Sequence, residues 1–258
     1  MNLITPGFYV YFRVKLELCG ILLWAMASSM IDYEHLYREF RSPITDIDCG
    51  AKCAPYNEKG VPFCCDTRHT VPTAYELEWA YLQAKTDLWH LWQVSDPRED
   101  HRMRSQTPPG QVLIECQGHL HCKREFRSLT CRSFPFFPYV NPAGKFLGLT
   151  YYWEYEDRCW VISNLERVSM EYIKEFAQTY QLIFATSPNE KSAFQYHSAM
   201  MRRIFGRKHR AIPLIGLDGQ YYKITPHNGR LRKIRAEQLS KFGVYRIAYR
   251  LPFPDEIS

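Results

Sequence analysis

The chain carries nine cysteines, and eight of them lie in one window that runs from residue 49 to residue 159. They follow the pattern C-x3-C-x10-C-C, then C-x5-C-x8-C after a long insert, then one late cysteine. Thiolates bind metals, and two short-spaced groups joined by an insert are typical of a site that the fold closes. The pattern predicts a metal centre, an iron–sulfur cluster or a zinc site, formed by Cys49, Cys53, Cys64, Cys65, Cys116, Cys122, Cys131 and Cys159.

The adjacent pair Cys64 and Cys65 constrains such a site. Neighbouring side chains generally diverge, so we expect one thiol to bind a metal while the other faces elsewhere or serves a second metal. A [4Fe–4S] cluster takes four cysteine ligands. For a single cluster, the sequence favours Cys116, Cys122 and Cys131 as ligands, with the fourth from the adjacent pair or from Cys159, because the loops between the first three are short.

Two other uses of eight cysteines compete with metal binding. In a secreted protein they could form four disulfides, and in a reducing compartment they could be inert, buried thiols. Inert core cysteines belong on helices and strands, whereas these lie in segments rich in Pro, Gly and Asp. We therefore favour metal binding, with a [4Fe–4S] cluster before zinc.

The stretch Cys116-x5-Cys122-x8-Cys131-Arg132-Ser133-Phe134-Pro135 resembles the signature of the YkgJ-type cysteine-cluster family, which is described as a zinc- or iron-chelating domain. The resemblance covers about residues 45–162 and implies that all eight cysteines form the chelating set. The flagellin lysine-N-methylase family is similar in its cysteine arrangement, including a late cysteine that Cys159 matches. Here the first group is wider than in the family, with ten residues between Cys53 and Cys64. A methylase-like activity would follow by analogy alone, so enzymatic activity stays open.

Few other residues point to chemistry. His119 and His121 flank the Cys116–Cys122 loop, and we expect them to be loop residues and not ligands. We expect Arg132 either to hydrogen-bond a cluster sulfur or to pair with Glu154, Glu156 or Asp157. The chain has no GxGxxG or GxxxxGK[ST] phosphate loop and no Ser-His-Asp signature, so no catalytic residue is assigned.

Positive charge is concentrated near the C-terminus. The formal charge is +6, and residues 200–250 hold thirteen Lys or Arg against Asp218 and Glu237. The run Arg202, Arg203, Arg207, Lys208, His209, Arg210 is compatible with nucleic acid, but a solvated helix end is favoured. A second hypothesis is therefore a zinc-stabilised, non-catalytic interaction module whose basic tail binds an acidic protein partner. The oligomeric state is not predicted.

The apolar stretch 18–31 resembles a weak signal peptide but is too short to span a membrane. Glu17 beside it and the strand-like residues before it argue against export, and translation from Met26 or Met30 fits as well. We expect a cytoplasmic protein without a membrane span.

Periodicity and turn residues predict an α+β fold. Helices are expected at 30–40, at 75–94 with Thr73 as cap, from Ser163 or Asn164 to 185, at 187–206 and at 235–242. Strands are expected at 111–115, 146–155 and 244–251, with a hairpin at Asp218-Gly219 and loops over 42–74, 95–110 and 116–145. The predicted organisation is an N-terminal segment (1–41), a cysteine-cluster domain with an inserted helix (42–162) and a helical, basic region (163–258).

Overall fold

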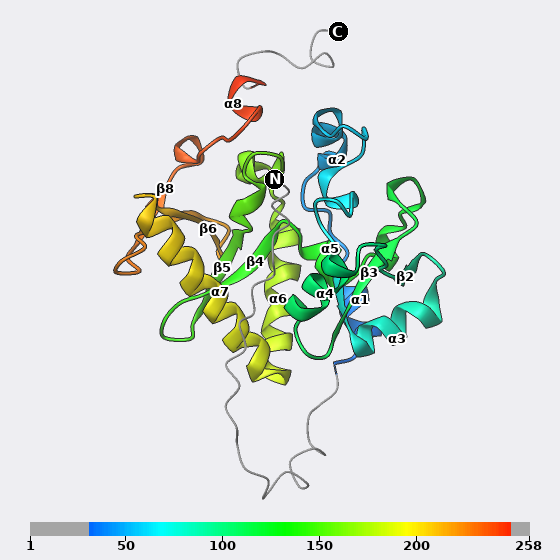
Figure 1. Cartoon of the computed structure of the whole chain (residues 1–258). Helices are drawn as coiled ribbons and strands as arrows, with labels where there is room; N and C mark the ends of the chain where they lie inside the picture. Colours follow the sequence, from blue (N-terminus) through cyan, green and yellow to red (C-terminus); the bar gives the residue numbers. More distant parts are fainter. Residues whose placement is uncertain (1–30, 249–258) are drawn as a thin grey trace, which may run out of the picture.

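The computed structural model describes residues 31–248 and has two antiparallel sheets (Figure 1). The smaller sheet has the strand order β1-β3-β2 and the larger one the order β4-β5-β6-β7-β8. The strands are β1 (Thr73–Tyr75), β2 (Trp89–Leu91), β3 (Gln111–Cys116), β4 (Phe136–Val140), β5 (Phe146–Tyr151), β6 (Ile212–Gly216), β7 (Tyr221–Ile224) and β8 (Leu231–Ile234). The predicted α+β class is confirmed.

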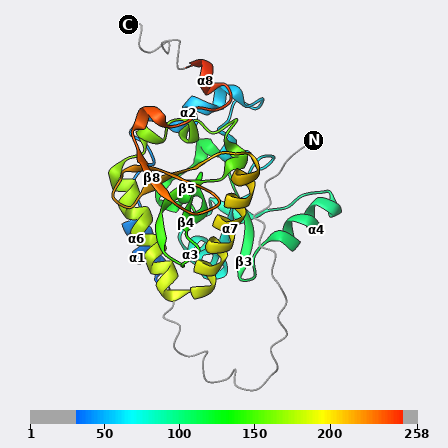
Figure 2. The same cartoon turned by 90° about the vertical axis from the view of Figure 1, so that its left-hand side faces the viewer.

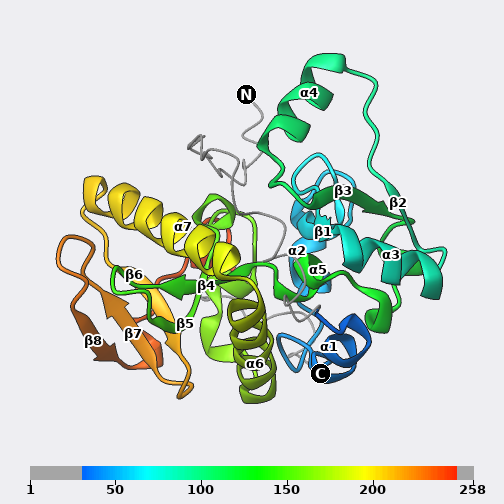
Figure 3. The same ribbon diagram turned by 90° about the horizontal axis from the view of Figure 1, so that it is seen from below.

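Helices lie beside both sheets. They are α1 (Tyr33–Glu39), α2 (Cys49–Cys53), α3 (Glu76–Lys85), α4 (Pro97–Gln106), α5 (Leu129–Ser133), α6 (Met170–Thr186), α7 (Pro188–Arg207) and α8 (Tyr245–Ala248). Helix α7 packs on strand β4 and on α6, so these two long helices cover the five-stranded sheet (Figure 3). Helix α4 stands apart at the edge of the molecule (Figure 2) and is held by Met103, which packs with Trp92 and Leu113. None of the helices within residues 31–248 is long and apolar enough to cross a membrane.

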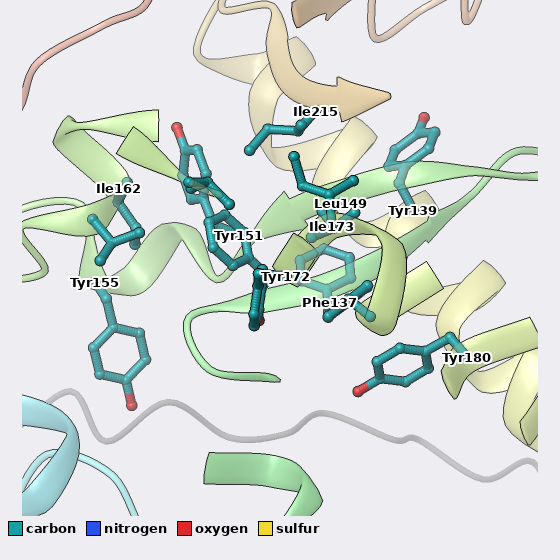
Figure 4. Close-up of a cluster of buried hydrophobic side chains, with 14 of the residues drawn as sticks. Phe137, Tyr139, Leu149, Tyr151, Tyr155, Ile162, Tyr172, Ile173, Tyr180 and Ile215 are labelled. Carbon is teal, nitrogen blue, oxygen red and sulfur yellow. The ribbon is translucent and has the colours of Figure 1, made fainter. Parts of the chain in front are cut away.

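Large aromatic side chains fill the core between the long helices and the larger sheet (Figure 4). Tyr139, Tyr151 and Tyr172 are fully buried. The hydroxyl group of each tyrosine forms a hydrogen bond, which offsets the free-energy cost of burying a polar group. The Tyr172 hydroxyl, for example, lies 3.1 Å from Arg132 O and 3.0 Å from Ser133 O. One continuous core runs from Tyr33 to Tyr245 and so includes residues from all three predicted segments.

Several predicted boundaries are confirmed because local capping decides them. Helix α7 begins at Pro188 with the Ser187 side chain as cap, as expected. The hairpin between β6 and β7 turns at Asp218-Gly219, and Gly219 has the positive φ of 72° that such a turn requires. Strand β3 and the first part of the 146–155 strand are also confirmed.

Two helix predictions were wrong in their limits. The helix expected over 75–94 ends at Lys85, because Thr86 is extended and its Oγ1 accepts a hydrogen bond from Leu88 N. Thr73 lies in β1 and caps nothing. The helix expected from Ser163 begins instead at Met170, because Ser169 provides the cap, while Ser163 Oγ accepts the Phe242 N–H at 2.9 Å.

Other segments were assigned to the wrong class. Residues 97–106, predicted as loop, form α4, in which Asp96 caps, Pro97 opens the helix and Arg104 pairs with Asp100. Strand β4 was missed because Pro138 lies in it; the strand is at the sheet edge, where a missing N–H is tolerated. The final strand was also wrong: its described part is α8, and β8 precedes it.

Candidate metal centre

The eight cysteines come from six separate segments, of which three are a strand or a short α-helix and three are 3₁₀ turns or residues beside them. Cys49 and Cys53 open and close α2, and the 3₁₀ turn η2 (Phe63–Cys65) carries the adjacent pair. Cys116 ends β3, Cys122 follows the 3₁₀ turn η3 (His119–His121), and Cys131 is in the middle of α5. Cys159 precedes the 3₁₀ turn η6 (Val161–Ser163). Ligands that converge from different directions need several separate segments, because one helix face presents only positions three or four apart.

Six of the eight cysteines line one cavity of about 860 Å³: Cys49, Cys64, Cys65, Cys116, Cys122 and Cys131. Cys53 and Cys159 lie next to this group, since each interacts electrostatically with the Cys49 thiol. The structure therefore brings all eight predicted residues into one region, although they span more than a hundred positions of sequence. Cys19 lies outside the described residues.

Helix α2 is fixed at its start and along one side. The Asp48 carboxylate caps it by accepting hydrogen bonds from Gly50 N at 2.8 Å and Ala51 N at 3.3 Å. A Cβ at position 50 would lie 2.9 Å from Pro62 Cγ, so glycine allows the turn that holds the adjacent pair to approach. Cys49 and Cys53, four residues apart, share a face of this helix.

A buried carboxylate anchors the loop that holds Cys64 and Cys65. Asp66 accepts hydrogen bonds from the Arg68 guanidinium at 2.7 Å and from the Asn57 side chain at 3.2 Å, and Lys59 is 3.4 Å away. The bonds from Arg68 hold the pKa of Asp66 well below its usual value. The loop is therefore tied to its neighbours through the residue that directly follows the adjacent pair.

A second buried carboxylate, Glu78 of α3, positions the helix that holds Cys131. Its Oε1 accepts the Leu129 N–H of α5 at 2.6 Å and the Tyr37 hydroxyl of α1 at 2.5 Å. Burial is the main cause of its raised pKa. The Ser128 side chain caps α5 by accepting the Cys131 N–H. Three helices thus meet at one carboxylate next to the cysteines.

Arg132 has neither of the two roles predicted for it. Its guanidinium donates to Tyr37 O in α1, to Phe40 O just after α1 and to Glu125 O, and it lies 4.2 Å from the centre of the Tyr37 ring. Glu154, Glu156 and Asp157 are not among its hydrogen-bond partners in residues 31–248. Arg132 is a buried brace between α5 and α1, and it borders the cavity without a described bond to sulfur.

The residue that does contact a sulfur is Arg127, whose Nε donates to Cys122 Sγ at 3.0 Å. Arg127 also interacts electrostatically with Cys131 and Cys65, and Arg124 with Cys49 and Cys122. Four thiolates around a divalent metal or a cluster leave net negative charge, which two guanidinium groups would offset. Sequence reasoning missed both arginines; their only signal was the cationic stretch inside the cysteine spacing.

Backbone N–H groups also point at several sulfurs. The Phe63 N–H bonds to Cys53, the Gly118 N–H to Cys116, and the Ile162 and Val161 N–H groups to Cys159. Each of these bonds favours the thiolate over the thiol. Hydrogen bonds of this kind accompany cysteine ligands in iron–sulfur sites, where they tune the potential of the cluster.

Burial nevertheless keeps most of these thiols protonated in the absence of a cation. Desolvation raises the pKa of Cys49 to about 11 and that of Cys131 to about 12, and nearby cysteines add to both shifts. The Cys64 and Cys65 sulfurs share a hydrogen bond across 4.0 Å, which raises the pKa of Cys64 and lowers that of Cys65. A bound metal cation reverses this balance because it stabilises each thiolate directly.

The cysteine sulfurs that border the cavity do not converge on a single point. Within residues 31–248, no three Cys, His, Asp or Glu side chains are arranged so that they could hold one metal ion. The described cysteines are free thiols. The 4.0 Å between Cys64 Sγ and Cys65 Sγ is about twice a disulfide bond length. His119 borders the cavity, whereas His121 is exposed and does not line it.

The basic run at the end of α7 is partly engaged within the protein. Arg202 donates to the Tyr139 hydroxyl at 3.1 Å, and Arg210 forms a salt bridge of 2.6 Å with Glu156. Arg210 also lies over the rings of Phe205 and Phe242. These two arginines therefore have structural partners and are not available as a free cationic surface.

No family model matches the chain, and no curated protein or solved structure is significantly similar to it. The resemblance to the cysteine-cluster family thus stays a prediction from the motif residues.

Proposed function

We propose that this protein is a metalloprotein whose cysteines hold an iron–sulfur cluster. One observation supports it above the others: six of the eight cysteines, from five separate segments, line one cavity, and Cys53 and Cys159 lie beside it. Inert thiols have no reason to converge, because each can be buried wherever the core has room. Converging thiols repel one another once ionised, so their arrangement costs free energy unless a cation is bound.

The cavity size favours a cluster over a single ion. Four sulfurs around one zinc ion lie about 3.8 Å apart, as follows from tetrahedral geometry and a Zn–S distance of about 2.3 Å. The sulfurs here line, together with many other residues, a cavity of about 860 Å³, which is far more space than one ion fills. An iron–sulfur cluster binds each cysteine through a different iron atom, so its ligands stand farther apart and suit an open arrangement better.

Zinc remains the second candidate because the gathered cysteines also supply the four thiolates that a tetrahedral zinc ion takes. In that case the protein would be a zinc-stabilised interaction module. Its basic tail would bind an acidic partner through the cations that have no role in packing. We propose the cytoplasm as its compartment in either case, since reducing conditions preserve thiols.

Anaerobic purification followed by absorption spectroscopy and metal analysis tests the proposal. A cluster gives a brown protein with a broad band near roughly 400 nm and matching amounts of iron and sulfide. Zinc without colour supports the second candidate, because a d¹⁰ ion has no such band. A folded protein that holds neither metal, and takes up neither after treatment with Fe²⁺ plus sulfide or with Zn²⁺, would overturn both candidates.

A further inference from the structure

A single metal group does not need eight cysteines. A tetrahedral zinc ion or one [4Fe–4S] cluster takes four thiolates. If the chain held one such group, four of its gathered cysteines would be bystanders, buried beside the site without a role. The neighbours of each sulfur indicate that the eight divide in a different way.

Four of the eight cysteines form a first set of neighbours. Cys49 and Cys53 lie one helical turn apart on α2 and interact electrostatically. Cys64 interacts with both of them, and Cys159 also interacts with both. This set, Cys49, Cys53, Cys64 and Cys159, brings together the first loop and the turn before η6.

The other four cysteines form a second set. Cys116 at the end of β3 interacts with Cys65 and with Cys122. Cys131 of α5 interacts with Cys65 and with Cys116. All four line the cavity, which Cys49 and Cys64 of the first set also border, and Arg127 contacts the second set through Cys122 Sγ at 3.0 Å. This set joins one member of the adjacent pair to the three later cysteines of the C-x5-C-x8-C motif.

The two sets meet at the adjacent cysteines of η2. The interactions that the structure gives between the sets both run to Cys65, one from Cys64 and one from Cys53. Adjacent side chains diverge from the backbone, which allows Cys64 to face one set and Cys65 the other while their sulfurs stay 4.0 Å apart. Arg124 and Arg127 each interact electrostatically with Cys49 in the first set and with Cys122 in the second, so the two sets share both cations.

We propose that the protein holds two metal groups, one on Cys49, Cys53, Cys64 and Cys159 and the other on Cys65, Cys116, Cys122 and Cys131. This inference rests on the proposed metal-binding function and adds the number of groups and their ligands. Each group is a [4Fe–4S] cluster or a tetrahedral zinc ion. The Cys64-Cys65 pair gives each group one ligand and sets the two groups side by side.

Native mass spectrometry and metal analysis of the anaerobically purified full chain give the number of groups. Eight irons, two zinc ions, or four irons with one zinc per chain agree with two groups. Four irons or one zinc ion per chain would overturn the two-group model while leaving the metal-binding function intact. A chain without metal after treatment with Fe²⁺ plus sulfide and with Zn²⁺ would overturn the proposed function itself. The two failures are therefore distinguishable.

Paired serine variants test which cysteines belong together. We expect Cys64→Ser and Cys65→Ser each to lose one group, about half of the bound metal. Cys64→Ser with Cys159→Ser removes two ligands of the same set, so it should still keep half of the metal. Cys65→Ser with Cys159→Ser removes a ligand from each set and should lose all of it. Cys19→Ser is the control that keeps both groups.

The division fails if the two double variants retain the same amount of metal, or if each single variant loses all of it. Far-ultraviolet circular dichroism of every variant shows whether the fold persists. A variant that unfolds is replaced by the serine variant of another member of its set, Cys49 for the first and Cys122 for the second.

Discussion

Glu78 provides a direct test of how the scaffold holds the centre. Its carboxylate is about 1% exposed and accepts hydrogen bonds from Leu129 N at 2.6 Å and from the Tyr37 hydroxyl at 2.5 Å. Glu78→Ala leaves both buried donors without an acceptor, which costs about 1–3 kcal/mol for each. Part of this loss is offset because the variant no longer buries a carboxyl group. We expect a net loss of about 3 kcal/mol.

A loss of this size is measurable by thermal unfolding. For a chain of this length, each kcal/mol lowers the melting temperature by about 2–4 °C, so Glu78→Ala should melt about 6–12 °C below the unchanged protein. Because Leu129 begins the helix that holds Cys131, the variant should also release metal to a competing chelator about tenfold more readily, as happens when residues behind metal ligands are changed.

Glu76→Ala is the matched control, since Glu76 lies in the same first turn of α3 but is exposed. We expect it to change the melting temperature by no more than about 2 °C, as surface substitutions usually do.

The pH dependence of stability adds an independent check on Glu78. The raised pKa of Glu78 contributes stability that is fully present below about pH 4.5 and is lost as the pH rises through the native pKa. Equal melting of the two variants at pH 7 would refute the role of Glu78.

Two further predictions concern other buried groups. His197 packs against Phe137 and Trp153, and burial lowers its pKa to about 4. The free energy of unfolding should therefore fall by about 3 kcal/mol as the pH drops from about 6.5 to 4. In urea unfolding at a series of pH values, the free energy of unfolding of His197→Phe should depend less on pH over that range. Arg127→Gln removes the cation 3.0 Å from Cys122 Sγ. It should make the reduction potential of a bound cluster more negative in a redox titration, while the exposed Lys123→Gln leaves it unchanged.

The parts of the fold that could be predicted from sequence are those that short-range chemistry decides. Ser187 followed by Pro188 begins α7, and Asp218-Gly219 turns the β6–β7 hairpin, because capping and positive φ depend on one or two residues. Helix α4 was missed because it is polar on most of its surface, although Asp96 and Pro97 mark its start.

The candidate site was predictable in its cysteines but not in the residues that support them. Glu78 follows Glu76 in a charged helix start and has the sequence appearance of a solvated residue, yet the approach of α1 and α5 buries it. Arg132 next to Cys131 looked like a partner for sulfur or carboxylate. Its guanidinium instead donates to backbone oxygens at the C-terminal end of α1, those of Tyr37 and Phe40. Such roles depend on which helices and strands pack together, and the local sequence pattern does not predict that packing.

The same dependence explains why the cysteines could not be divided from spacing. Loop length favours Cys116, Cys122 and Cys131 as one group, and the structure does place them together. Spacing alone cannot say that Cys159 is a neighbour of Cys49 and Cys53, because folding of the intervening β4–β5 region brings them together. Short spacing therefore predicts which candidate ligands are neighbours within one local motif. The other candidate ligands come from segments that are distant in the sequence, and only the fold places them beside the motif. The adjacent cysteines matter most in such a fold, because they are the one point at which a local motif can contribute to two sites.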